Sequence, residues 1–307
     1  MNMFEKIQWR ARLFREEVAN KHIAILFYGL LPQALRSERL FHAIIFRVIT
    51  TDKVWKKLIR VSSSGDSWIF NFKDIEIEYP KNATCLPLID QYVEILLPYL
   101  NVSDEVKHMV QRVTPGRLRE PYEYGGAVLK EGDVILDAGA NVGMFSIFAA
   151  KKLNDKATIY AFEPMPIPRA LLEANLARNN IKSVTVVPRA VGRENAARKF
   201  FVGILKASGS AYFIRGRKES VDVQQVSCDS FVREQGLLRV DFIKVDIEGM
   251  EQEFLMGAKE VIQRFTPRMA IAAYHREGDF DVIEKMLKEF VPQYQIVRTS
   301  DKIFAWV

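Results

Sequence analysis

Apolar and polar positions along residues 121–307 alternate between two patterns, and these predict strands and helices in turn. Short β-branched and apolar runs are typical of strands buried on both faces, and segments with apolar residues at helical spacing follow them. The expected strands are 134–136, 158–162, 184–187, 241–246, 269–274, 294–298 and 303–307. The expected helices are the one starting at Val142, 166–179, 253–265 and 280–290. This order predicts an α/β fold: a doubly wound, seven-stranded, mostly parallel sheet with helices on both faces.

Two further β regions stand outside this alternation. Residues 198–227 are expected to form two strands, 199–202 and 221–226, around a glycine-containing loop. Period-two alternation over 68–79 predicts a hairpin that follows a turn at 62–67. Residues 1–60 and 86–112 have helical spacing, so we expect an extension of helices and a β-hairpin over 1–115 and a catalytic domain over 116–307.

The first core strand leads into a glycine turn that follows an acid, Asp137-x-Gly139-x-Asn141-x-Gly143. Glycine lets a backbone approach a ligand closely, and asparagine tolerates similar dihedral angles. A dinucleotide fingerprint would carry a third glycine and bind a pyrophosphate, beside which an acid is a poor choice. An acid here suits a ligand with a positive charge, such as the sulfonium and ammonium of S-adenosylmethionine (SAM).

An acid on the next strand supports the same cofactor. Glu163 follows the strand 158–162, where its two carboxylate oxygens could accept both hydroxyls of the ribose. Asp137 and Glu163 could instead cap the helices that follow them. Because the two acids occur in order on successive strands, we favour the cofactor interpretation.

Composition and charge limit the remaining classes. With 307 residues and 49% hydrophobic content, the chain can bury a full core. Its two cysteines, Cys85 and Cys228, give no disulfide framework or zinc spacing, which is consistent with a reducing, cytoplasmic location, and we expect no secretory signal. Residues 1–60 carry twelve lysines and arginines against five acids, a net charge of +7, while the whole chain has +6. The catalytic part is therefore nearly neutral, and we expect no nucleic-acid partner.

The basic extension leaves two interpretations open. Its apolar run 23–31 is much shorter than the roughly twenty residues that a membrane span needs. A helix lying on an anionic membrane surface needs a basic face beside an apolar one, which residues 1–60 provide. A helical cap on the catalytic domain is the alternative, and a homo-oligomer is also compatible with the sequence.

Several motifs in order resemble the FkbM-type family of SAM-dependent methyltransferases. They are 134–143, 160–164, Asn175 with 179–180, 190–192, 242–251 and 257–258. The resemblance covers roughly 119–275 and implies methylation of hydroxyl oxygens, mostly of sugars, glycolipids and polyketides. It implies cofactor roles for Asp137, Gly139, Asn141, Gly143, Glu163 and Ala190. Asp246 and Glu248 would face the transfer site. Many members end the fifth strand with an acid, whereas this chain has Ala273-Tyr274 followed by His275.

The chemistry of methyl transfer suggests roles for the residues after the fourth strand. The acceptor oxygen attacks the methyl carbon in line, and a hydroxyl is a weak nucleophile unless its proton is removed as the bond forms. We expect Asp246 to be the base, with Glu248 beside it and His275 as the next candidate. Glu251 is expected to stabilise the start of the following helix. Asp246, Glu248 and His275 could hold a metal, but nothing in their spacing requires one, and we predict none.

Other functions fit the sequence less well. A nicotinamide oxidoreductase would need a third glycine near Gly143, and a non-catalytic module would be expected to lose Asp137 and Glu163. An amino-methylating nucleic-acid enzyme would carry an Asn-Pro-Pro-Tyr-type motif after the fourth strand, and none is present. Tyr122 and Tyr124 could line the cofactor site or pack on the domain edge, and the sequence does not separate these alternatives.

Overall fold

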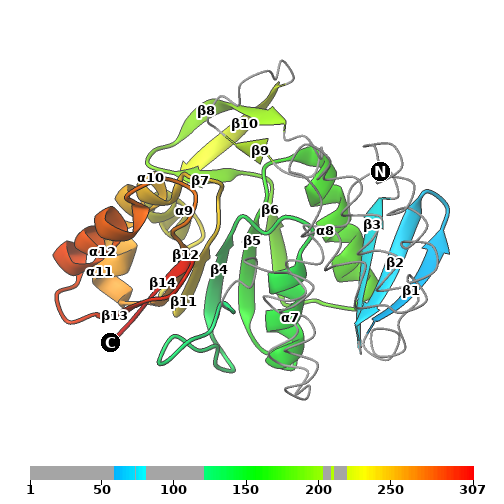
Figure 1. Cartoon of the computed structure of the whole chain (residues 1–307), viewed down its shortest axis with the longest axis horizontal. Coiled ribbons are helices and arrows are strands. Elements are labelled where there is room, and N and C mark those ends of the chain that lie inside the picture. The colour runs from blue at the N-terminus through cyan, green and yellow to red at the C-terminus, as the bar shows by residue number, and fades with distance from the viewer. Residues whose placement is uncertain (1–58, 73, 81–120, 203–208, 211–219) are drawn as a thin grey trace, which may run out of the picture.

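The structure is a computed structural model that describes residues 59–72, 74–80, 121–202, 209–210 and 220–307 (Figure 1). The helical region predicted over 1–60 lies outside the described residues except for Ile59 and Arg60, which belong to a strand and not to a helix. The helix predicted over 86–112, Cys85 and the expected boundary at 115/116 also lie outside the described residues. Among the described residues, no helix is both long and apolar enough to cross a membrane.

A seven-stranded sheet forms the centre of the described chain and confirms the predicted fold class. Its strand order is β13-β14-β12-β11-β4-β5-β6, and the five strands from β12 to β6 are parallel. β14 runs antiparallel to β12 and pairs with β13 as a terminal hairpin. The strands are β4 (Val134–Ala138), β5 (Thr158–Phe162), β6 (Val184–Val187), β11 (Phe242–Val245), β12 (Arg268–Ala272), β13 (Gln295–Arg298) and β14 (Lys302–Trp306).

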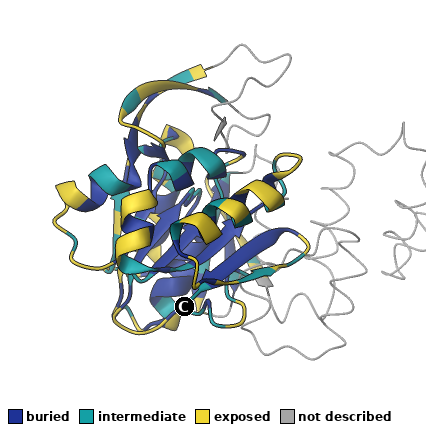
Figure 2. Ribbon diagram, turned by 90° about the vertical axis from the view of Figure 1, so that its left-hand side faces the viewer, coloured by how far each residue is buried: buried dark blue, intermediate teal, exposed yellow. Residues whose placement is uncertain are grey.

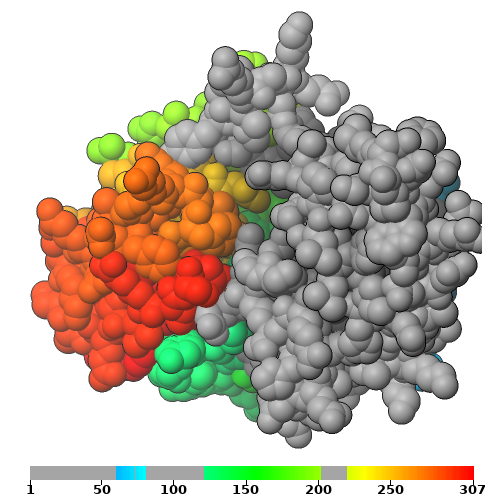
Figure 3. Space-filling model, viewed as in Figure 1, coloured from blue at the N-terminus to red at the C-terminus, as the bar shows by residue number. Residues whose placement is uncertain are grey.

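Helices cover both faces of this sheet. Because successive side chains of a strand point to opposite faces, Ile135 joins one apolar cluster and Leu136 the other. One cluster lies under α7 (Met144–Lys152) and α8 (Pro166–Arg178). The other lies under α9 (Cys228–Glu234), α10 (Glu251–Met256), α11 (Lys259–Phe265) and α12 (Asp279–Phe290). Figure 2 shows the buried strands between helices whose outer faces are exposed, and Figure 3 shows the last elements of the chain, in orange and red, at the molecular surface.

The single helix predicted over 253–265 is wrong, because the chain forms α10 and α11 with a break at Gly257–Ala258. The break follows from close packing. A Cβ at Gly257 would lie 2.1 Å from the carbonyl oxygen of Gly192, and the Gly257 carbonyl accepts a hydrogen bond from the Asp229 amide. Backbone contact with two other segments therefore replaces helix continuation at this point.

The predicted β excursion is confirmed as part of a second, four-stranded sheet with the order β7-β10-β8-β9. Its strands are β7 (Ala190–Gly192), β8 (Ala196–Val202), β9 (Gly209–Ser210) and β10 (Ser220–Ser227). Phe200 and Val223 of this sheet pack with Met165 and Met250, which follow β5 and β11. The small sheet therefore lies at the carboxyl ends of the central strands.

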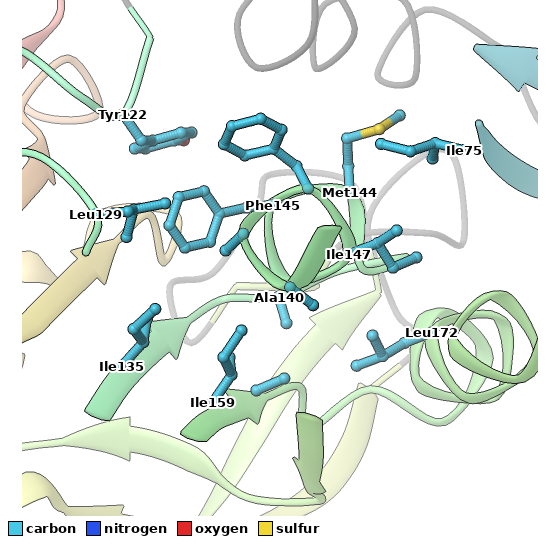
Figure 4. Close-up of a cluster of buried hydrophobic side chains, with 14 of the residues drawn as sticks. Ile75, Tyr122, Leu129, Ile135, Ala140, Met144, Phe145, Ile147, Ile159 and Leu172 are labelled. Carbon is cyan, nitrogen blue, oxygen red and sulfur yellow. The ribbon is translucent and has the colours of Figure 1, made fainter. Parts of the chain in front are cut away.

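The predicted hairpin is present but belongs to a three-stranded sheet, β1 (Ile59–Ser64), β2 (Ser67–Phe72) and β3 (Ile75–Pro80). The turn expected over 62–67 is limited to Gly65 and Asp66, because residues through Ser64 pair with β2. Ile75 and Ile77 of β3 belong to the same apolar cluster as Met144 of α7. Figure 4 shows Ile75 beside Met144, so this sheet shares the core of the catalytic domain.

Two asparagines, Asn175 of α8 and Asn179 at the C-cap of this helix, pair with the outer edge of β3. The Asn179 side-chain amide accepts from the Glu76 amide at 2.9 Å and donates to the Glu76 carbonyl at 2.6 Å. Asn175 accepts from the Glu78 amide at 2.6 Å and donates to the Glu78 carbonyl at 3.4 Å. Each asparagine thus makes the pair of bonds that a neighbouring strand would make.

Candidate active site

The carboxyl ends of four neighbouring parallel strands bring the predicted site residues to one edge of the sheet. Asp137 lies at the end of β4, Glu163 follows β5, Asp246 follows β11 and His275 follows β12. Ligands of open α/β sheets bind at this edge. The structure therefore brings together residues that are up to 138 positions apart in the sequence.

The glycine turn after β4 adopts the backbone conformation that its sequence indicates. Gly139, Asn141 and Gly143 all have positive φ, at 81°, 52° and 91°. A Cβ at Gly139 would lie 2.0 Å from the carbonyl oxygen of Asp246, so only glycine fits there. Gly139 thus puts the cofactor turn in direct backbone contact with the loop that carries the predicted catalytic acid.

Glu163 holds this turn from the neighbouring strand. Its Oε2 accepts from the Asn141 amide and its Oε1 from the Met165 amide, both at 2.9 Å. Each carboxylate oxygen has a second lone pair, so Glu163 can still accept hydrogen bonds from two ribose hydroxyls. Burial raises the pKa of Glu163 to about 7, against the opposing effects of these two amides and of the Lys244 charge.

Asp137 is fully buried, and its charge is already paired within the protein. Its Oδ2 accepts from the Ser146 hydroxyl at 2.6 Å, and its Oδ1 lies 3.0 Å from Lys244 Nζ. Lys244 also donates to the Gly139 carbonyl at 2.7 Å. In this arrangement Asp137 holds Ser146 and Lys244 beside the turn, and its direct contact with the cofactor stays a prediction.

Ala190 is placed in β7, where it pairs with Gln225 of β10 and is 3% exposed. It packs in the apolar cluster that includes Met165 and Met250. The predicted cofactor role of Ala190 stays a prediction.

Asp246 lies at the centre of a group of side chains beside the cofactor turn. Its Oδ2 accepts from the Tyr122 hydroxyl at 2.6 Å, and its Oδ1 accepts from the Tyr274 hydroxyl at 3.3 Å. His275 Nε2 lies 3.5 Å from the same Oδ1. The Asp246 side chain keeps 19% of its surface exposed, so one carboxylate combines fixed partners with access to solvent.

Glu251 connects His275 to the loop that carries Asp246. The carboxylate is fully buried, and its Oε1 accepts from the amides of Ile247 at 3.0 Å and Gly249 at 3.3 Å. His275 Nδ1 lies 3.0 Å from the same oxygen, in an ion pair whose N–H does not point squarely at it. Glu251 therefore lies in the first turn of α10, as expected, but its carboxylate binds amides of the preceding loop.

The charge state of His275 follows from these neighbours. Burial alone would lower the pKa of the imidazole, but the contact with Glu251 and the charges of Asp246, Glu251 and Glu248 outweigh it. Together they raise the pKa of His275 to about 9. At neutral pH the side chain is therefore an imidazolium among three carboxylates.

Glu248 occupies the exposed side of this group. Its Oε2 lies 3.8 Å from His275 Nε2, and 53% of its side chain is exposed. The residue has a φ of 56°, which is uncommon for glutamate and is often associated with functional sites.

One group of described residues has the geometry to supply ligand atoms to a metal ion. Asp246, Glu251 and His275 each offer an atom, and these atoms lie within 4.8 Å of one another. Glu251 thus replaces Glu248 in the set suggested by the sequence. Binding of a metal would require His275 to release the proton that it holds at neutral pH. The absence of a metal stays a prediction.

Sequence reasoning missed two contributors and left a third open. Lys244 was part of a motif but had no assigned role, and a lysine inside an apolar strand is a signal for a buried ion pair. Tyr274 stands where many family members have an acid, and this difference does not predict its contact with Asp246. Tyr122 and Tyr124 are separated by the structure, since Tyr122 is buried at the site and Tyr124 is 44% exposed.

The chain is similar to several proteins whose names identify them as methyltransferases. The chain is 24% identical over 209 residues to the 31-O-demethyl-FK506 methyltransferase FkbM of Streptomyces tacrolimicus, covering 59% of this chain and 79% of that protein. It is 27% identical over 162 residues to the hexuronic acid methyltransferase AglP of Haloferax volcanii, covering 52% of this chain and 63% of that protein. The crystal structure of a methyltransferase FkbM from Methylobacillus flagellatus is 20% identical, with a TM-score of 0.48, over 64% of this chain and 52% of that one.

The sheet order, the glycine turn and the contact of Glu163 with this turn are those of a Rossmann-like, class I SAM-dependent methyltransferase. The family model for the methyltransferase FkbM domain matches residues 137–294, which is more than half of the chain. The protein belongs to the FkbM methyltransferase family.

Proposed function

We propose that this protein transfers a methyl group from SAM to a hydroxyl oxygen of a sugar, a glycolipid or another small natural product. Two relatives support this proposal, since the name of one contains O-demethyl-FK506 and that of the other hexuronic acid. Bound SAM supplies an electrophilic methyl group on a sulfonium. The residues of this chain then have to hold the acceptor hydroxyl in line and remove its proton.

The position of Asp246 carries the proposal. Its carboxylate is partly exposed and is fixed by Tyr122 and Tyr274, and the backbone carbonyl of the same residue contacts Gly139 of the cofactor turn. A hydroxyl donating to this carboxylate would therefore lie beside the cofactor turn. In the transfer, the hydroxyl oxygen would bond to the methyl carbon as the carbon–sulfur bond breaks and the sulfur leaves as a neutral thioether, and Asp246 would accept the hydroxyl proton.

Asp246 suits this role better than His275. The imidazole already holds a proton at neutral pH, because its pKa is about 9, so it cannot accept another. As an imidazolium, His275 instead orients Asp246 Oδ1 and offsets part of the negative charge of the acids. The exposed carboxylate of Glu248 would bind a second hydroxyl of a polyhydroxylated acceptor.

The test incubates the full chain with SAM and a panel of hydroxylated compounds, including uronic acids and glycolipids, beside matched amino compounds. Transfer to oxygen, located by NMR of the product, is expected, and transfer to the amines alone would contradict the proposal. In Asp246→Asn, turnover should fall by roughly two to four decades while cofactor affinity is retained. The control Asp281→Asn changes an exposed acid of α12 and should leave turnover unchanged.

A further inference from the structure

Two tyrosines that are two residues apart in the sequence have different surroundings in the structure. Tyr122 is 4% exposed, and its hydroxyl donates to Asp246 Oδ2 at 2.6 Å. Tyr124 is 44% exposed, and its ring lies 5.5 Å from the ring of Phe304. Tyr122 alone of this pair therefore contacts the predicted catalytic acid.

The Tyr122 ring lies close to two buried ammonium groups. Lys302 Nζ is 4.6 Å and Lys244 Nζ is 5.3 Å from the centroid of the ring. Both lysines are nearly inaccessible, at 0% and 4% exposed. Figure 4 shows that Tyr122 also packs beside Phe145, which meets the ring edge on at 5.5 Å.

Both ammonium groups are held in place by other partners. Lys302 Nζ donates to Asp301 at 2.7 Å, and Lys244 Nζ donates to the Gly139 carbonyl and pairs with Asp137. Cations fixed near an aromatic ring attract its electrons, which makes the phenol O–H a stronger donor. The short bond from Tyr122 to a carboxylate agrees with such a charge-assisted hydrogen bond.

Lys244 and Tyr122 connect the cofactor turn with Asp246. Lys244 contacts Gly139 on one side and the Tyr122 ring on the other, and Tyr122 holds Asp246 Oδ2. Asp246 Oδ1 is the oxygen that faces Tyr274 and His275. With Oδ2 fixed, rotation of the carboxylate is restricted, and Oδ1 is kept in one position.

We propose that Tyr122 is a positioning residue for methyl transfer: its hydroxyl, strengthened by Lys244 and Lys302, fixes the carboxylate of Asp246 toward the acceptor. This inference rests on the proposed function, because it assigns Asp246 the role given there.

The test compares Tyr122→Phe with the matched control Tyr124→Phe. Tyr122→Phe keeps the ring and both lysine contacts and removes only the hydroxyl. We expect kcat to fall by roughly tenfold to a hundredfold while the KM for SAM stays within about twofold, and the acid limb of the pH profile to move to higher pH. Tyr124→Phe should match the unmodified protein. Equal kcat and pH profiles for the two variants would overturn the inference.

A second measurement needs neither SAM nor an acceptor. The Asp246 carboxyl carbon is titrated by NMR in the full chain and in Tyr122→Phe. Loss of a hydrogen bond to the charged form should raise its midpoint by about one pH unit. An unchanged midpoint would overturn the inference even if no acceptor were found. Absence of methyl transfer by the unmodified chain, with the midpoint shifted as expected, would instead count against the proposed function alone.

Discussion

The two halves of the active site, the cofactor turn and the group around Asp246, are built in different ways. In the cofactor turn, backbone groups dominate: Glu163 accepts two amides, and Gly139 fits against a carbonyl. Around Asp246, side chains from separate segments meet, with His275 between three carboxylates. A site made of backbone tolerates few changes of shape, whereas one made of side chains is sensitive to charge.

The largest expected effect comes from breaking the contact between the two halves. Gly139→Ala places a methyl group against the Asp246 carbonyl and should lower the free energy of unfolding by about 3 kcal/mol or more. Gly132→Ala is the matched control, because Gly132 has the same φ of 81° but nothing within 4 Å of its added Cβ. We expect it to cost only about 1–2 kcal/mol. Urea denaturation measures both, and equal losses would show that crowding at Gly139 is unimportant.

A second change sharpens the contrast by removing a charged group from the backbone-dominated half. Glu163→Ala should weaken SAM binding by roughly 1.5–3 kcal/mol in calorimetry, because the ribose hydroxyls lose their paired acceptors. Glu173→Ala, at an exposed position of α8, is the control and should bind normally. In the unmodified protein, affinity should also fall as the pH drops below about 7, where Glu163 gains a proton. An affinity independent of both changes would remove Glu163 from the cofactor site.

The smallest effect is expected from the charge of His275. Its pKa is raised from 6.5 to about 9 on folding, so the folded state binds more protons than the unfolded state between these values. The stability that this provides is fully present below pH 6.5 and is lost as the pH rises through about 9. Thermal unfolding of His275→Gln should lack this loss, which is about 1.4 kcal/mol for each pH unit between the two pKa values. Parallel pH curves for the two proteins would show that the imidazole is not charged in the folded state.

Features that depend on neighbouring residues could be predicted from the sequence, whereas contacts between distant segments could not. The strand 158–162 and the turn around Gly139 depend on neighbouring residues, so local patterns identified them. The contact between Glu251 and His275 arises only because β11 and β12 are adjacent, which no local pattern records. The break at Gly257 was missed for a related reason, since it depends on packing against Gly192.

The pairing of α8 with β3 has a consequence for where a minimal catalytic fragment can begin. Asn175 and Asn179 are buried, and much of their hydrogen bonding is to Glu76 and Glu78. A fragment starting at residue 116 would expose these amides beside an apolar surface that β3 normally covers. Such a fragment would lack β1, β2 and β3 and with them the backbone groups that Asn175 and Asn179 bind. A chain that starts at residue 116 should therefore be insoluble or misfolded and not a smaller enzyme.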